Sequence, residues 1–200
     1  MKSNRRTQEQ RSEATRAALI QAARPLFAAS GFAAVGTEAI VRAAGVTRGA
    51  MYHQFADKTD LFAAVFEAVE ADLTRRIDDA VGGSGLTDPI ALMRLGAATW
   101  LDACAEPEVQ RIVLIEAPSV LGWVRWREIS LRYGMGLVQS LVSYAISVGR
   151  IAEQPPEPLS HVLIGAIDEA ALYLSQAEDP VRARADIGAV LDRLIDSLAV

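Results

Sequence analysis

The sequence contains little of the chemistry expected of a secreted or membrane-spanning protein. Its single cysteine, Cys104, excludes an intrachain disulfide and gives no support for an oxidising compartment. No stretch approaches the roughly 20 consecutive apolar residues of a membrane-spanning helix. The polar N-terminal residues are not followed by the apolar run of a signal peptide. We therefore expect a cytoplasmic protein without a membrane partner.

Recognisable catalytic and metal-binding patterns are also missing. We find no Ser-His-Asp set, no cluster of metal ligands and no glycine-rich phosphate loop, because Gly82–Gly85 follows an expected helix and not a strand. The two histidines, His53 and His161, are far apart in the sequence. We predict no metal and no cofactor. Carboxylates are plentiful, so a helical enzyme with an unrecognised site stays as an alternative.

Composition and charge favour an all-helical chain with two unlike ends. Only 6% of the residues are aromatic, β-rich runs are missing, and alanine, leucine, arginine and glutamate abound. Residues 1–60 carry nine basic and five acidic side chains, a net charge of +4, whereas residues 61–200 carry 11 and 20, a net charge of −9. This division indicates a basic end that could approach nucleic acid and an acidic remainder.

The most informative stretch runs from Thr37 to Lys58 and predicts two short helices joined by a tight turn. Thr37 is a suitable N-cap for the first helix, and Gly45 suits the left-handed position at its end. Thr47 can cap a second helix over Arg48 to Phe55. Two such helices around a glycine turn form a helix-turn-helix unit, whose second helix can enter the DNA major groove.

The exposed side of that second helix has the residue types that contact DNA. Arg48 can form two hydrogen bonds to a guanine edge, and Gly49 permits close backbone approach. The alternative is that Tyr52 only packs in the core and Arg48 is only solvated surface. The candidate DNA-contacting residues are Thr37, Thr47, Arg48, Gly49, Tyr52, His53, Gln54 and Lys58.

These residues also resemble a known family. The run Gly-x-x-Tyr-x-x-Phe-x-x-Lys, from Gly49 to Lys58, is similar to the TetR (tetracycline-repressor-like) family of transcriptional regulators, and the resemblance extends upstream to Ala22. The family's usual histidine before the phenylalanine is replaced by Gln54, which can donate a hydrogen bond but cannot become charged. The resemblance implies an all-α fold, DNA contacts at the matching positions and a homodimer.

The rest of the chain reads as a series of helices. We expect a disordered start to about residue 10, a first helix over 12–29 and a long helix over 60–81 capped by Asp57. Further helices are expected over 89–104, 107–116, 122–149, 159–177 and 180–199, with a loop at 118–122. We predict a three-helix DNA-binding domain over 1–60 and a helical effector-binding and dimerisation domain over 61–200.

Bulky and polar side chains in the second domain suggest a ligand cavity. An acidic residue in an apolar helix, such as Asp168 or Glu169, is costly to bury unless it is paired. The alternatives are core tryptophans and an Asp168 paired with an arginine across a dimer. The candidate ligand-contacting residues are Met93, Trp100, Cys104, Trp123, Trp126 and Asp168.

The last two helices have matching apolar stripes that could form a dimer interface. Two such helices that meet their symmetry mates would make a four-helix interface, although the same stripes would also suit an intrachain core. The candidate interface residues are Leu163, Ala166, Ala170, Leu174, Ile187, Val190, Leu191 and Leu194.

The sequence therefore predicts a DNA-binding transcriptional regulator with three partners: a double-stranded DNA operator, a small-molecule effector and a second copy of the chain. We expect a ligand-responsive repressor that binds an inverted repeat. A constitutive DNA-binding regulator without an effector is the second alternative beside the helical enzyme.

Overall fold

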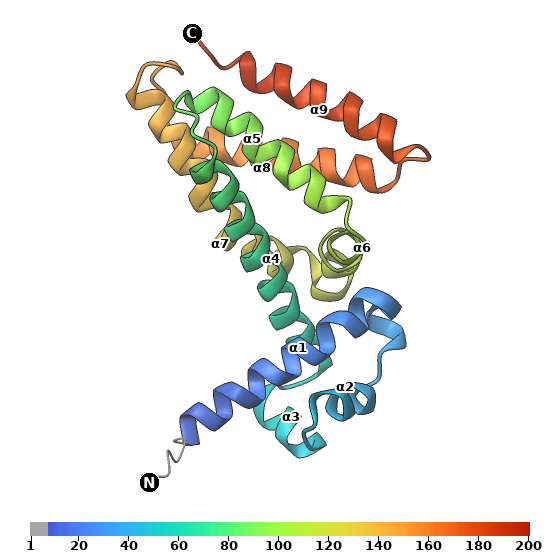
Figure 1. Ribbon diagram of the computed structural model, residues 1–200. Coiled ribbons are helices and arrows are strands. Elements are labelled where there is room, and N and C mark those ends of the chain that lie inside the picture. The colour runs from blue at the N-terminus through green and yellow to red at the C-terminus, as the bar shows by residue number, and fades with distance from the viewer. Residues whose placement is uncertain (1–7) are drawn as a thin grey trace.

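The computed structural model describes residues 8–200, which form an all-helical molecule with a small end and a larger end (Figure 1). The helices are α1 (Gln8–Ala34), α2 (Thr37–Ala44), α3 (Arg48–Gln54), α4 (Lys58–Gly83), α5 (Pro89–Cys104), α6 (Pro107–Val109), the π-helical segment η1 (Gln110–Glu116), α7 (Ala117–Ser147), α8 (Pro156–Ser175) and α9 (Pro180–Asp196). The described residues contain no strand beyond one isolated bridge between Ile151 and Ala199. The expected all-α fold is confirmed.

The small end, here called the head, consists of α1, α2 and α3 packed around a few fully buried side chains. Leu19 and Phe27 of α1, Ile40 of α2 and Met51 of α3 are each shielded from solvent. The expected first helix begins too late, because residues 8–11 are already helical. Residues 1–7 lie outside the described residues.

Two glycines define where the helices of the head stop and start. Gly31 has φ 78° and ψ 164°, so it interrupts the helical conformation within α1. Gly36 is the residue that precedes α2, and Thr37 is its first helical residue. The prediction of Thr37 as N-cap is therefore wrong by one position. The chain begins the helix without a side-chain cap because glycine has no side chain to accept a hydrogen bond.

Helix α4 leaves the head and enters the larger end, here called the body, which contains α5 to α9 (Figure 1). Its start is capped as predicted, since the Asp57 carboxylate accepts a hydrogen bond from the Asp60 N–H at 2.8 Å. Its apolar face is buried along most of its length, from Leu61 to Leu73. One continuous hydrophobic core therefore runs from the head into the body, and a second core lies at the far end of the body.

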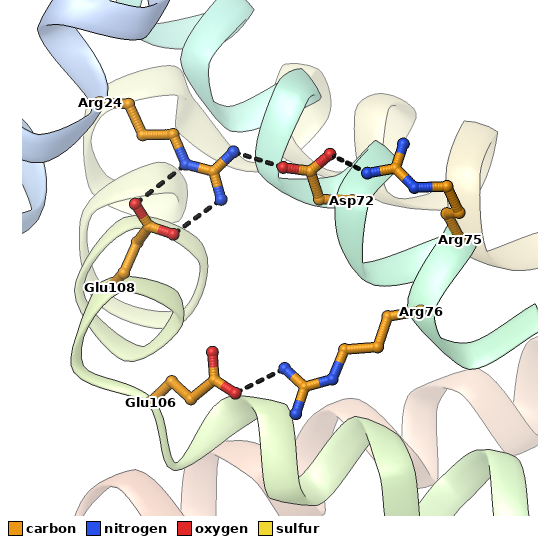
Figure 2. Close-up of polar contacts among 6 residues, drawn as sticks. All are labelled: Arg24, Asp72, Arg75, Arg76, Glu106 and Glu108. Carbon is orange, nitrogen blue, oxygen red and sulfur yellow. Dashed lines mark hydrogen bonds and ion pairs between the residues drawn. The ribbon is translucent and has the colours of Figure 1, made fainter. Parts of the chain in front are cut away.

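A set of ion pairs joins the head to the body beside α4 (Figure 2). The Arg24 guanidinium of α1 donates to both carboxylate oxygens of Glu108 in α6, at 2.9 and 2.7 Å, and also to Asp72 of α4. Arg76 of α4 pairs with Glu106 just before α6. The hydrogen bonds to Glu108 raise the pKa of Arg24, so the guanidinium stays protonated and positively charged. The start of α6 is thereby held against both α1 and α4.

The segment after η1 differs from the sequence-based expectation. Residues 118–122, predicted as a loop, lie within α7. Pro118 lies in the first turn of α7, directly after the π-helical segment η1. A kink remains at Gly122, which has φ 72° and ψ 161°. The predicted loop over 118–122 is therefore wrong, and the departure from helical geometry is confined to Gly122.

Replacement of Gly31 by alanine should destabilise the protein by about 1–3 kcal/mol, because its backbone conformation is one that essentially only glycine adopts. An added Cβ would also press on the Glu116 carboxylate. Urea unfolding would measure the effect. Gly136→Ala is the control, since the space around that helical glycine is open. That variant should be unchanged or more stable by up to about 1 kcal/mol. Equal stability of both variants would contradict the strain at Gly31.

Candidate functional site

The turn between α2 and α3 has the geometry that the sequence predicts. Gly45 adopts a left-handed conformation with φ 66°. The Val46 N–H closes the helix end by donating to the Val41 carbonyl at 3.0 Å. The Thr47 hydroxyl then accepts a hydrogen bond from the Ala50 N–H at 3.1 Å, so it caps α3 as expected. The two helices form a helix-turn-helix unit that packs on α1.

The outer side of α3 is free to meet a partner. Arg48, Gly49 and His53 are exposed. Tyr52 is 43% exposed, which does not fit the alternative that it packs in the core. The Arg48 guanidinium lies 5.6 Å from the centre of the Tyr52 ring. The positive charge and the aromatic ring therefore stand together at the N-terminal half of the helix, where a recognition helix contacts base edges.

Two of the predicted DNA-contacting side chains, those of Lys58 and Gln54, form hydrogen bonds with other residues of the protein. The Lys58 ammonium donates to the carbonyls of Phe32 and Val35, at 2.9 and 3.1 Å, and it lies 4.1 Å from the centre of the Phe32 ring. The Gln54 amide donates to the Ser12 hydroxyl at 2.8 Å. Each group keeps further N–H donors, but its position is set by the head. Their contacts with phosphate stay predictions.

The body contains a cavity of about 300 Å³ between α4, α5, η1, α7 and α8. Five of the six predicted ligand-contacting residues line it: Met93, Trp100, Trp123, Trp126 and Asp168. Cys104 is not among the lining residues. It is fully buried in the core that joins head and body, and burial raises the pKa of its thiol. The sequence placed Cys104 on the correct helix, but not on the side that faces the cavity.

Polar groups in this cavity have fewer partners than buried groups usually have. The indole N–H groups of Trp100 and Trp126 are buried and have no acceptor among the described residues. A buried donor without an acceptor costs roughly 1–3 kcal/mol. Walls of apolar side chains surround these two donors. The cavity wall therefore includes two tryptophans whose N–H groups are buried and unpaired within the described residues.

Sequence reasoning missed the most unusual residue in the lining, Glu70 of α4. Its side chain is buried, and the hydroxyl of Ser130 donates to it at 3.4 Å. Burial and, to a smaller extent, the nearby charge of Asp168 together raise the pKa of Glu70 to about 8. One signal was available, because Glu70 follows Phe66 by four residues on the buried face of an otherwise apolar helix.

Asp168 has a partner inside the same chain. The Arg127 guanidinium donates to its carboxylate at 2.9 Å. Burial raises the pKa of Asp168 to about 6, against the attraction of Arg127. The alternative of an arginine across a dimer is thus not needed to explain this acid. Glu169, the next residue, is exposed and does not line the cavity.

The predicted interface residues on α8 and α9 divide into two groups. Leu163, Ala170, Leu174 and Leu191 are buried inside the chain, so they are unavailable to a second copy. Ala166 and Ile187 are half-buried against the core, and Val190 and Leu194 are exposed. The apolar stripe seen in the sequence is mainly the intrachain one. A different face of α8 is open, with Val162 66% and Tyr173 53% exposed.

Metal-binding clusters and membrane-spanning helices are both missing from the described part of the chain. Between residues 8 and 200 no group of three or more metal-ligating side chains comes together. No helix in that range is both long and apolar enough to cross a membrane.

Comparison with known proteins agrees with this geometry. The family model for bacterial regulatory proteins of the tetR family matches residues 19–65, and that for the tetracyclin repressor-like C-terminal domain matches residues 90–198. The Transposon Tn10 TetC protein of Escherichia coli is 27% identical over 180 residues, which cover 88% of each chain.

Solved structures show the same relationship. A TetR-family transcriptional regulator from Pectobacterium atrosepticum is 34% identical, with a TM-score of 0.85 over 98% of both chains. RolR, solved in complex with the ligand resorcinol, has a TM-score of 0.75 at 21% identity and covers 94% of this chain and 90% of its own. The helix-turn-helix head and helical body thus define a DNA-binding transcriptional regulator. The chain belongs to the TetR family.

The buried carboxyl of Glu70 should make stability depend on pH. Folding raises the pKa of Glu70 from 4.5 to about 8. Between these two pH values the folded protein keeps the Glu70 proton, whereas the unfolded chain has lost it. The free energy of unfolding should therefore fall as pH rises. Asp168 acts in the same direction, but only up to about pH 6. Between pH 6 and 8 the fall due to Glu70 should reach about 2 kcal/mol.

Chemical unfolding of Glu70→Gln at several pH values would test this expectation, because glutamine cannot titrate. The variant should lose most of the fall between pH 6 and 8. Glu67→Gln is the control, since Glu67 lies one turn earlier on α4 and pairs with Arg132 on a partly exposed side. If Glu70→Gln kept the wild-type pH dependence, another group would be responsible.

Proposed function

We propose that this regulator is a ligand-responsive repressor that binds an inverted-repeat operator as a homodimer. Residues 1–60 serve as the DNA-binding domain, and residues 61–200 bind the effector and the second copy. The observation that carries the proposal is the position of α4. Its first half packs into the head, and Glu70, Thr74 and Ile77 of its second half line the cavity. A molecule in the cavity would therefore contact the same helix that packs into the core of the head.

In the head, α3 is the helix proposed to read bases. Arg48 reaches a guanine edge, and Gly49, Tyr52 and His53 lie along the same exposed surface. Thr37, Thr47, Gln54 and Lys58 lie at the ends of α2 and α3 or just beyond them, where backbone phosphates pass. The exposed Arg48–Tyr52 pair supports this assignment, because neither side chain is needed to close the core.

Arg48→Ala should lower operator affinity by roughly 1–3 kcal/mol and relax the preference at one base position. Binding of randomised operators in solution would measure both effects. Arg75→Ala removes an exposed arginine from α4 in the body and controls for the loss of one positive charge. If Arg48→Ala weakened all sequences equally, with a salt slope smaller by about one unit, Arg48 would be a phosphate contact and not a base reader.

The second copy is proposed to pack on the open faces of α8 and α9. Val162, Gly165 and Tyr173 are exposed on one side of α8, and Val190 and Leu194 are exposed on α9. The absence of other atoms within 4 Å of a Cβ added to Gly165 supports close helix approach there. Two-fold symmetry then requires an inverted repeat, with half-sites about one DNA turn or a multiple apart.

Val162→Arg should convert the dimer into a folded monomer and abolish tight operator binding, because two arginines would meet at the symmetric interface. Sedimentation would report the mass, and circular dichroism the helix content. Val124→Arg is the matched control, since Val124 is 68% exposed and lies on α7, outside the two helices of the proposed interface. A Val162→Arg protein that stayed dimeric would refute this placement of the interface.

Occupation of the cavity is proposed to release DNA. The volume of the cavity and its apolar lining resemble small-molecule sites. RolR, a protein of the same fold, was solved with a ligand. A shift from about 99% to about 1% DNA-competent molecules needs roughly 5.5 kcal/mol of differential binding, which two sites per dimer can share. A regulator without an effector would show no ligand-dependent loss of operator binding.

An effector should change tryptophan fluorescence and release the operator over the same concentration range, because Trp100, Trp123 and Trp126 all line the cavity. Trp100→Ala should weaken this release while operator affinity without ligand stays unchanged. Fluorescence and DNA binding in the same titration would measure both. Release at concentrations that leave the fluorescence unaltered would place the effector outside the cavity.

A further inference from the structure

The acidic side chains of the cavity wall narrow the class of molecule that the cavity accepts, and this inference rests on the effector site proposed above. Two carboxyl groups, from Glu70 of α4 and Asp168 of α8, line the space, whereas none of the arginines, lysines and histidines between residues 8 and 200 does so. We propose that the effector is a compact, mainly apolar amine that binds as a monocation, with its ammonium group paired with the Glu70 carboxylate.

Glu70 has an oxygen atom that is available to a ligand. The residue is only 5% exposed, and its Oε1 accepts a hydrogen bond from the Ser130 hydroxyl at 3.4 Å. Its Oε2 has no hydrogen-bond partner among residues 8–200, yet this atom retains accessible surface, unlike the indole nitrogens of Trp100 and Trp126. Since the Glu70 side chain lines the cavity, Oε2 is the atom that a hydrogen-bond donor inside the cavity would meet.

The charges around the cavity leave a place for one positive charge. Asp168 accepts a hydrogen bond from the Arg127 guanidinium at 2.9 Å, so these two charges offset each other. An ionised Glu70 would add a buried negative charge without a partner, and in the empty cavity a proton on Glu70 removes that charge. A monocation can replace the proton with no net change in charge. An anion would lie beside two acidic groups, which repel it.

Binding of the amine should therefore release a proton. Below about pH 8 the empty protein holds a proton on Glu70. The ammonium group takes the place of this proton, which passes to the solvent, and an alkylammonium ion keeps its own protons at neutral pH. Because one proton leaves for each amine bound, amine affinity should rise by about tenfold to twentyfold between about pH 6.5 and 8.

The other ionisable groups that face Glu70 contribute little to this change. Tyr133 of α7 and Cys104 of α5 both have raised pKa values, so they stay uncharged over this range. Asp168 of α8 has a pKa of about 6 and is mostly ionised above it, and Arg127 of α7 remains its cationic partner. Glu70 is therefore the group that titrates across this range.

The remaining lining sets the size and the apolar character of the ligand. Because the indole nitrogens of Trp100 and Trp126 are sealed, carbon atoms of these two side chains form their part of the wall. A volume of about 300 Å³ is at the lower end of the range of roughly 300–1,000 Å³ found for small-molecule sites. This space suits one or two rings with a short amino-bearing substituent. The aliphatic lining residues include Met93, Leu137, Leu141, Leu163 and Ile167.

A panel of size-matched probes tests the proposed class on the intact protein. The amines aminoindane and phenethylamine are compared with the uncharged alcohols indanol and phenylethanol. The hydrocarbons indane and ethylbenzene and the anions indane carboxylate and phenylpropionate complete the panel. Calorimetry at about pH 8 reports affinity, and operator release is measured in parallel. Each amine should bind at least about tenfold more tightly than its matched alcohol, hydrocarbon and anion, because a hydrogen bond between charged groups is stronger.

Proton release is measured on the protein without any substitution. Calorimetry of aminoindane at about pH 7, in two buffers of different ionisation enthalpy, should show about one proton released for each amine bound. Indanol should release none, because it brings no charge. The affinity of aminoindane should rise with pH as stated above, whereas that of indanol should change by less than about twofold.

Substitutions then connect the preference to Glu70. Glu70→Gln keeps the size of the side chain but cannot ionise, so it should weaken aminoindane about tenfold at pH 8 and remove both the proton release and the pH dependence. Glu67→Gln is the control, since Glu67 lies one turn earlier on α4, pairs with Arg132 and does not line the cavity. This control should bind aminoindane as the wild type does. Indanol affinity should change by less than about threefold in either variant.

The outcomes separate the ligand class from the sensor function. Binding of an alcohol, hydrocarbon or anion as tightly as the matched amine would overturn the proposed class, and so would failure of both amines to bind. Amine binding without proton release, or an unchanged pH dependence in Glu70→Gln, would overturn the pairing with Glu70. Amines that bind without release of operator would leave the class standing and contradict the sensor function. Release of operator by an alcohol or an anion, with no binding of the amines, would do the reverse.

Discussion

The buried face of α4 is the contact on which both ends of the molecule depend. Phe62 of α4 meets Phe27 of α1 edge-to-face, with ring centres 5.2 Å apart, so the helix is part of the core of the head. Farther along, the same helix contributes Glu70 to the cavity of the body. The same helix is therefore packed both in the core of the head and in the wall of the cavity.

Charged side chains add a second connection between the same two ends. Arg24 binds Glu108 and Asp72, and the Phe32 N–H beyond the Gly31 break donates to Glu116 at 3.0 Å. Partly exposed ion pairs stabilise proteins only slightly. The bidentate geometry of the Arg24–Glu108 pair nevertheless restricts the angle between α1 and the α6–η1 segment. Val113 and Leu114 of η1 also line the cavity. The α6–η1 segment therefore contacts both the cavity and α1.

The cavity departs from the rules that stabilise an ordinary core. Interiors normally pair their buried polar groups and leave few voids. Here two indole donors lack acceptors among residues 8–200, and a buried carboxyl has one long hydrogen bond to Ser130. The empty cavity is less stable than a filled core of the same size would be. Such departures are expected at functional sites.

The local features of the fold were determined by the sequence. Thr47 and Asp57 cap the helices that follow them, Gly45 closes α2, and Pro89–Cys104 is a helix with the predicted bounds, because caps and glycine turns act over a few residues. Tertiary structure decided which neighbour each face meets. It committed the Lys58 ammonium to backbone carbonyls, kept Cys104 out of the cavity and buried Leu163 inside its own chain. Helical periodicity identifies an apolar face, but only packing determines whether that face meets the core, a cavity or a second copy.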